Sequence, residues 1–107
     1  MKRSMEQVYL RIFKDKGYVV VAACDRNVLG RTFREGKLRL EVASRFYGGD
    51  LCGVEETMQA LQAADIGNLV GGKVIDAAVQ KGLVDPDAIL TIGGVPHVQI
   101  VKIGRLR

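Results

Sequence analysis

The sequence is poor in the residues that most often build metal centres, disulfide frameworks and catalytic sites. Its 107 residues include two cysteines, one histidine and no tryptophan. Cys24 and Cys52 stand far apart without a CxxC pair, so neither a zinc site nor a disulfide framework is expected. Cys24 lies in an apolar run that favours an inert, packed thiol, and His97 has few candidate partners for acid–base work. We therefore expect no metal, no cofactor and no catalytic residue, and an enzyme is the less favoured interpretation.

Long apolar runs are also absent. No stretch approaches the ~18 continuous apolar residues of a membrane span, and residues 1–5 lead into a charged, alternating segment rather than an apolar signal core. Hydrophobic residues make up 48% and charged residues 26% of the chain, which is ordinary usage for a folded domain. We expect one cytoplasmic globular domain over residues 1–107, with residues 1–5 flexible and no membrane contact.

Negative charge is scarce at the two ends of the chain. The formal net charge is +4, and residues 1–50 hold 11 Lys/Arg against 6 Asp/Glu. Residues 51–90 reverse the balance with 2 against 6, and residues 91–107 hold 3 against none. Because clustered cations raise the local potential, the basic parts permit a polyanionic partner without requiring one.

Hydrophobic alternation predicts strands at both ends of the chain. Residues 8–13 alternate with period two, residues 18–24 form a β-branched apolar run, and turn residues between them predict a hairpin. Residues 37–42 predict a third strand. Its side chains predicted to point inward are Leu38, Leu40 and Val42. A closing strand pair is predicted at residues 89–92 and 97–103.

Helical spacing dominates the middle of the chain. It predicts one helix over residues 54–70 and a second over residues 73–80, separated by Gly71 and Gly72. Proline after Asp85 predicts a short capped turn. The order β-β-β-α-α-β-β predicts an α+β fold, in which a mostly antiparallel sheet carries two helices packed on one face.

Residues 67–74 match the GxxxxGK part of a phosphate-binding loop. Val74 stands where that loop needs a Ser or Thr hydroxyl for magnesium, and the preceding residues are predicted to be helical rather than a buried strand. We therefore interpret the segment as a connection between two helices. The helix that begins at Gly72 could still hold a single anion at its N-terminus.

Cations and aromatic residues are interleaved over residues 31–47, a mixture that contacts phosphates and stacks bases. The segment lacks an RNP sequence, a GxxG clamp and a zinc knuckle, and solvated loops with aromatic anchors are the simpler interpretation. The leading functional hypothesis is nevertheless a non-enzymatic binding module for RNA or a ribonucleoprotein. Besides the basic C-terminus, its candidate RNA-binding residues are Arg31, Arg34, Lys37, Arg45 and Tyr47.

Two alternatives from other classes remain. One is a small-molecule or nucleotide-binding enzyme whose pocket is gathered from the glycine-bearing loops, which suit close backbone approach. Its candidate ligand-binding residues are Asn68, His97 and Gln99, with Tyr47 beside them. The other is a protein–protein adaptor.

Four segments in fixed order carry a resemblance that covers nearly the whole chain after Met5. They are Phe46-Tyr47-Gly48-Gly49, Asn68-Leu69-Val70-Gly71, Gly82-Leu83-Val84-Asp85-Pro86, and Gly94-Val95-Pro96-His97 with Gln99. Together they resemble the archaeal domain-of-unknown-function family 424, whose members are small standalone proteins. The resemblance implies no activity and no site residue, and it modestly favours a binding role related to translation.

Overall fold

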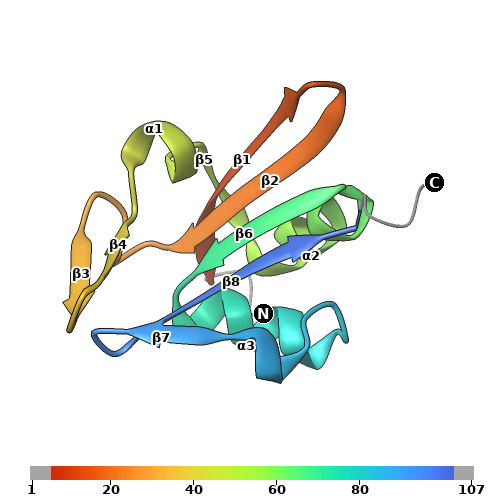
Figure 1. Cartoon of the computed structure of the whole chain (residues 1–107). Helices are drawn as coiled ribbons and strands as arrows, with labels where there is room; N and C mark the ends of the chain where they lie inside the picture. The colour runs from red at the N-terminus through yellow and green to blue at the C-terminus, as the bar shows by residue number, and fades with distance from the viewer. Residues whose placement is uncertain (1–5, 103–107) are drawn as a thin grey trace.

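The computed structural model describes residues 6–102 of the chain (Figure 1). The strands are β1 (Gln7–Asp15), β2 (Tyr18–Asp25), β3 (Thr32–Glu35), β4 (Leu38–Glu41), β5 (Asp50–Gly53), β6 (Ile66–Val70), β7 (Leu90–Ile92) and β8 (Val95–Val101). The helices are α1 (Ser44–Tyr47), α2 (Val54–Ala63), α3 (Gly72–Gln80) and the short 3₁₀ helix η2 (Pro86–Ala88). The predicted flexibility of residues 1–5 and the predicted strand end at Ile103 lie outside the described residues.

Six strands form one sheet in the order β5-β1-β2-β6-β8-β7, and β3 and β4 form a separate two-stranded sheet. All pairs are antiparallel except β2 with β6, which run parallel at the centre. Helices α2 and α3 lie on one side of the large sheet, while α1 and the β3–β4 hairpin lie at one end of the molecule (Figure 1). The predicted α+β class, with a mostly antiparallel sheet and two main helices, is confirmed.

The predicted opening hairpin is confirmed as β1 and β2. Its strands pair from Val8 opposite Asp25 to Asp15 opposite Tyr18. Lys16 and Gly17 take φ values of 54° and 88°, which is the left-handed pair of a tight two-residue turn whose twist matches that of the strands. The alternation seen in the sequence therefore places successive β1 side chains on opposite faces of the sheet.

The main core lies between the large sheet and the two helices. Its buried members include Val8, Leu10, Val21 and Leu69 from the strands, and Leu61 and Ile75 from the helices. Gly67 allows the close packing of α2 on β6, because a Cβ at that position would stand 2.6 Å from Leu61 Cδ1. The ten residues of α2 and nine of α3 are far too few to cross a bilayer, and no helix within residues 6–102 is long and apolar enough to do so.

A second core lies on the opposite side of the sheet, beneath the β3–β4 hairpin and α1. Buried Leu40 and Val42 belong to it, as predicted. Leu38 does not, because it lies beside the hairpin turn with 48% of its surface exposed. The alternation in residues 37–42 correctly predicted the strand, but the second core does not extend to the β3–β4 turn beside Leu38.

The prediction of one helix over residues 54–70 is wrong in its second half. Helix α2 ends at Ala63, and residues 66–70 form β6 between β2 and β8. Ala64 leaves the helix with extended angles, φ −82° and ψ 155°. Because β6 is central, both of its faces are partly covered, so its short sequence lacks the clear alternation of a half-exposed strand. The strands β3 and β5 and the helix α1 were also missed.

Candidate functional site

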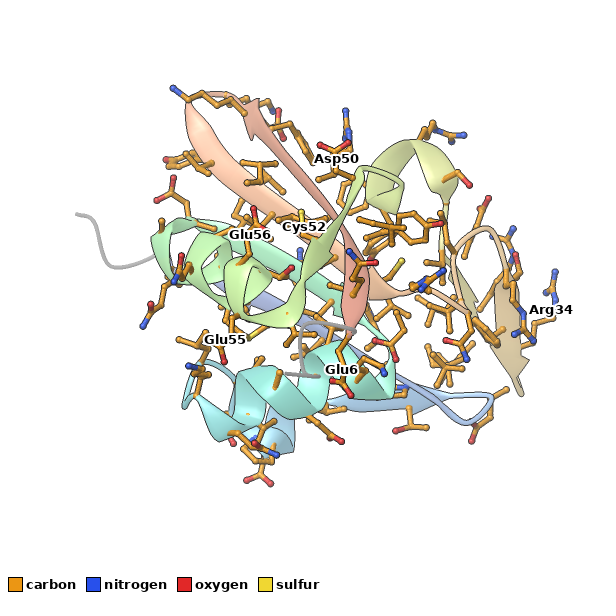
Figure 2. All side chains as sticks on the ribbon, turned by 180° about the vertical axis from the view of Figure 1, so that it is seen from behind. Glu6, Arg34, Asp50, Cys52, Glu55 and Glu56 are labelled. Carbon is orange, nitrogen blue, oxygen red and sulfur yellow. The ribbon has the colours of Figure 1, made fainter. Side chains whose placement is uncertain are left out.

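The predicted RNA-binding cations belong to a small raised feature, which we call the basic hairpin: Arg31, β3, the turn Gly36–Lys37, and β4. In the β3–β4 register, Arg34 lies directly opposite Arg39. Both side chains are on the side of the hairpin away from the core, because Phe33 and Leu40 occupy the core side. Figure 2 shows Arg34 at the edge of the molecule, directed away from its body.

The two arginines have different surroundings. Arg39 Nη2 lies 3.4 Å from Glu41 Oε1, and both side chains are about half exposed. Such an exposed ion pair contributes little. Arg34 has no ion pair with any residue of the described chain 6–102. The outer surface of the basic hairpin therefore carries two arginines whose Cβ atoms are about 5 Å apart, and the carboxylate of Glu41 lies beside Arg39 on β4.

Contacts on its core side fix the basic hairpin in place. Arg31 donates a hydrogen bond from Nη1 to the Asn27 carbonyl at 3.1 Å, and its guanidinium lies 5.0 Å from the centroid of the Phe33 ring. Glu35 accepts a hydrogen bond from Gly93 N at 2.8 Å, which ties the hairpin to the β7–β8 turn. Arg31 and Glu35 thus serve the placement of the hairpin, which leaves Arg34 and Lys37 as its freely exposed predicted cations.

The remaining two predicted RNA-binding residues lie on α1 and differ sharply in exposure. Arg45 is exposed, whereas Tyr47 is only 5% exposed and belongs to the second core. The Tyr47 ring meets Phe46 edge to face at 4.9 Å between centroids. Burial, and secondly the nearby Cys24 thiol, raise the pKa of Tyr47 to about 12. A ring in this position anchors α1 and offers no face to a base.

The sheet surface opposite α2 and α3, which we call the open face, brings two predicted ligand residues together. Asn68 on β6 lies directly opposite Gln99 on β8. On the other side of Asn68 comes Ala22 of β2, followed by Arg11 of β1. Arg11, Asn68 and Gln99 therefore form one row across the sheet, although a strand lies between the first two. Sequence reasoning missed Arg11, even though the alternation of residues 8–13 already placed it on this face.

His97 lies on the same face as Asn68 and Gln99, in the neighbouring row, opposite Val70. It is half buried, and this burial lowers the pKa of the imidazole below its ordinary value. The four proposed pocket residues thus share one side of the sheet, but they do not form an enclosed site, because Tyr47 is buried within the second core and Gln99 is exposed.

An open cavity of about 410 Å³ is found elsewhere, where the parallel strands β2 and β6 end. This is the edge at which α/β sheets commonly bind ligands. Its lining residues are Gln7, Asp25, Arg26, Asn27 and Lys73. None of the predicted ligand residues lines it.

The N-terminus of α3 borders this cavity, and the side chain of Asp25 already occupies this helix end. The carboxylate accepts hydrogen bonds from the backbone nitrogens of Lys73 and Val74, each at 2.9 Å. These N–H groups have no partner within the helix, and the positive end of the helix favours an anion. The single anion that this helix end could hold is therefore supplied by the chain itself.

The elements around the GxxxxGK motif differ from those expected from the sequence. A buried strand, β6, does precede the helix, contrary to expectation. Residues 67–70 belong to that strand, so Gly71 is the single residue between strand and helix. A one-residue connection cannot wrap around a phosphate. The phosphate-loop interpretation fails on geometry as well as on the missing hydroxyl at Val74.

The cysteines lie in surroundings that disfavour the reactive thiolate. Cys24 is completely buried, and burial together with neighbouring Asp25 raises its pKa to about 12. Burial, then Glu56 and Asp50, raise the pKa of Cys52. Figure 2 shows Cys52 on β5 close to Glu56 of α2. Within residues 6–102, no three His, Cys, Asp or Glu side chains are grouped so that they could hold a metal ion.

These features define a small α+β domain in which a mixed six-stranded sheet carries helices on one side and a basic hairpin on the other. The chain belongs to the family described as "Protein of unknown function (DUF424)", whose model matches residues 13–103. It is similar to the crystal structure of an uncharacterized conserved protein from Methanopyrus kandleri, with 29% sequence identity and a TM-score of 0.73. That likeness covers 88% of this chain and 90% of the other. No curated protein matches the sequence.

Proposed function

We propose that this protein is a non-enzymatic RNA-binding module that contacts phosphates through the basic hairpin and Arg45. The observation that carries the proposal is the position of Arg34 directly opposite Arg39 on the solvent side of β3 and β4. Like charges in this arrangement destabilise a strand pair. A bound polyanion removes that cost, because each phosphate neutralises cations that the protein itself leaves largely unpaired.

The charges on the basic hairpin and on the α2 side favour the hairpin as the surface that meets a polyanion. The carboxylates of Asp50, Glu55 and Glu56 lie on β5 and α2, away from Arg34 (Figure 2). An approaching phosphate chain is attracted to the hairpin and repelled from the α2 side. Glu55 is paired with Lys81 at 3.0 Å, and the hairpin itself carries Glu35 and Glu41. The cations of the hairpin still outnumber its carboxylates, and this excess orients a polyanion before contact.

The proposed contact residues differ from those expected from the sequence alone. We keep three of the predicted contact residues, Arg34, Lys37 and Arg45. We add Arg39, because the strand register places it opposite Arg34. Arg31 stabilises the local structure, because its guanidinium lies over the Phe33 ring and donates a hydrogen bond to the Asn27 carbonyl. From the basic C-terminus, Lys102 donates hydrogen bonds to the last carbonyls of α2, those of Leu61 and Gln62. The resemblance to family 424 suggests an RNA or ribonucleoprotein of translation as the partner.

The enzyme alternative has weaker support. Its proposed residues share the open face, but the observed cavity lies elsewhere and the nearby Cys24 thiol holds its proton strongly. The adaptor alternative rests on no particular contact. An RNA partner accounts for the opposed arginines of the hairpin.

A binding assay with a charge-matched control tests the proposal. Fluorescence anisotropy with labelled ribosomal RNA fragments at low salt compares the wild-type protein with the triple variant Arg34→Ala, Lys37→Ala, Arg45→Ala. We expect the variant to bind at least about tenfold more weakly, because each lost phosphate contact removes a charge-assisted interaction.

The control removes the same number of cations elsewhere. Lys14→Gln, Lys16→Asn and Lys81→Gln alter the far turn of β1–β2 and the end of α3, and asparagine suits the positive φ of residue 16. This control should lose less than about threefold in affinity through net charge alone. Equal losses in the two triple variants, or no RNA binding by the wild type, would refute the proposal.

A further inference from the structure

The open face has a surface that the basic hairpin does not explain. Two rows of side chains cross its four central strands. The polar row is Arg11, Ala22, Asn68 and Gln99, and the apolar row beside it is Phe13, Val20, Ile66 and Val101. Gln99 is exposed and Val101 is 55% exposed, so the β8 end of both rows lacks the cover that α1 and the hairpin give to the second core. Ala22 and Val20 of β2 are buried, at 0% and 4% exposure, and Ala22 belongs to that core. In Figure 1, α2 lies behind β6 and β8, and no helix of the described chain lies in front of them.

We propose that the open face binds the unpaired bases of a single-stranded RNA segment, a proposal that rests on the RNA-binding function proposed above. The chemistry of the polar row fits base edges. Asn68 and Gln99 each present an amide with both donors and an acceptor, which can pair with the complementary groups of a base. Their positions in neighbouring strands place the two amides side by side, within reach of adjacent bases.

The apolar row and Arg11 provide surfaces for the faces of bases. The Arg11 guanidinium lies 4.4 Å from the centroid of the Phe13 ring, and Phe13 meets Phe46 of α1 edge to face at 5.6 Å. This support holds a planar cation on the open face, and guanidinium planes stack on RNA bases. Ile66 and Val101 add apolar area at the other end of the row.

Charge favours RNA over a protein strand as the occupant. The two rows include one cation, Arg11, and no carboxylate, although Asp15 lies further along β1 near the turn. Arg45 stands on α1, whose Phe46 touches the same face through Phe13, so cations continue from the open face toward the basic hairpin. A ribose–phosphate backbone that follows these cations leaves its bases over the sheet.

The width of the face sets the length of the segment. Strands β1, β2, β6 and β8 are neighbours, and three interstrand spacings span about 14 Å. The β2 side chains of both rows are buried, so bases contact the face at β6 and β8 and at Arg11 and Phe13 of β1. A four-stranded sheet face of this kind accommodates two or three bases. Paired bases in a duplex have their Watson–Crick edges and their faces occupied, so a duplex can reach the hairpin cations but cannot lay its bases on the open face. We therefore expect the open face to distinguish single strands from duplexes.

The test compares two identical substitutions on opposite sides of the sheet. Gln99→Glu places a carboxylate on the open face, and Gln59→Glu places one on the exposed side of α2 with the same change of net charge. Arg11→Gln serves as a second variant on the open face. Binding of a single-stranded RNA of mixed sequence and of the corresponding duplex is measured for each variant by fluorescence anisotropy at one salt concentration, with circular dichroism as a check on folding.

We expect Gln99→Glu and Arg11→Gln to weaken single-strand binding about threefold to tenfold, and Gln59→Glu to change it less than twofold. Duplex binding should change less than twofold in all three variants. Wild-type affinity of both open-face variants for single strands, while the Arg34 triple variant has lost binding, would overturn this inference and leave the hairpin function standing. Absence of RNA binding by the wild type would overturn both.

Discussion

The carboxylate of Asp25, at the end of β2, accepts a hydrogen bond from the backbone nitrogen of Lys73 in the first turn of α3, across 48 positions of sequence. A second hydrogen bond comes from the nitrogen of Val74. One side chain thus joins the central parallel strand to the helix that follows its neighbour. It occupies the helix end that, from the sequence, could have held a single anion.

Removing this carboxylate should destabilise the fold. Asp25→Ala leaves two backbone N–H groups without acceptors, one of them buried, so we expect the free energy of unfolding to fall by about 2–4 kcal/mol. Asp25→Asn keeps one acceptor and should lose less. Urea denaturation followed by circular dichroism measures both, with the exposed Asp76→Ala on α3 as the control, for which we expect a change within about 0.5 kcal/mol. An unchanged midpoint for Asp25→Ala contradicts this account.

Substitution of alanine for Gly71 and for Gly72 should change stability in opposite directions. Gly71 has φ 113°, and a Cβ there would stand 2.4 Å from Asp25 Cγ, so Gly71→Ala should cost about 2–4 kcal/mol of stability. Gly72 is the first residue of α3 and has no atom within 4 Å of a Cβ, so Gly72→Ala should be neutral or stabilise by up to about 1 kcal/mol. Thermal unfolding of the two variants measures both changes in stability. Equal changes would contradict the geometry at Gly71 and Gly72.

Alkaline pH should destabilise the protein, because two buried groups keep their protons only in the folded state. The pKa values of Cys24 and Tyr47 both rise to about 12, from ordinary values of 9.0 and 10.0. The unfolded chain releases these protons at lower pH than the folded chain, so stability is full below about pH 9 and declines as the pH rises toward 12. Urea midpoints measured between pH 8 and 11 should show this decline, and Cys24→Ala should make it shallower. A midpoint independent of pH over this range contradicts the prediction.

Because Arg34 lies opposite Arg39, an acidic substitution of Arg34 should raise stability and weaken RNA binding. Arg34→Glu places a carboxylate opposite Arg39, which should stabilise the hairpin by about 0.2–1 kcal/mol. The same substitution should weaken RNA binding more than the neutral Arg34→Gln does, because it repels phosphates. Thermal unfolding and RNA titration of the two variants measure the two effects. A variant that is both more stable and equally tight in binding would show that Arg34 has no part in the interaction.

Local patterns predicted much of the fold. Alternation and the Lys16–Gly17 turn gave the β1–β2 hairpin, and helical spacing gave α2 and α3. Asp85 was correctly predicted to cap a short turn, since its side chain accepts a hydrogen bond from Asp87 N at 3.0 Å. These features depend on neighbours close in sequence, where period and capping chemistry are visible.

The errors concern features that long-range packing decides. The apolar residues of β6 follow those of α2 with little change in pattern, and only the flanking strands β2 and β8 make residues 66–70 extended. Tyr47 resembled an exposed stacking residue because it stands among cations, but α1 turns its ring into the second core. The position of Arg34 opposite Arg39, and of Asn68 opposite Gln99, depends on strand register, which the composition of either strand alone does not reveal.

The salt dependence of RNA binding tests the central claim most directly. Because phosphate neutralisation releases counterions, the logarithm of affinity should fall linearly with the logarithm of salt concentration. Replacing Arg34, Lys37 and Arg45 with alanine should flatten that slope by about two to three units, since each phosphate contact contributes roughly 0.7 to 0.9. The Lys14, Lys16 and Lys81 control should keep the wild-type slope. A triple hairpin variant whose slope equals that of the wild type would contradict the proposal that the basic hairpin binds RNA.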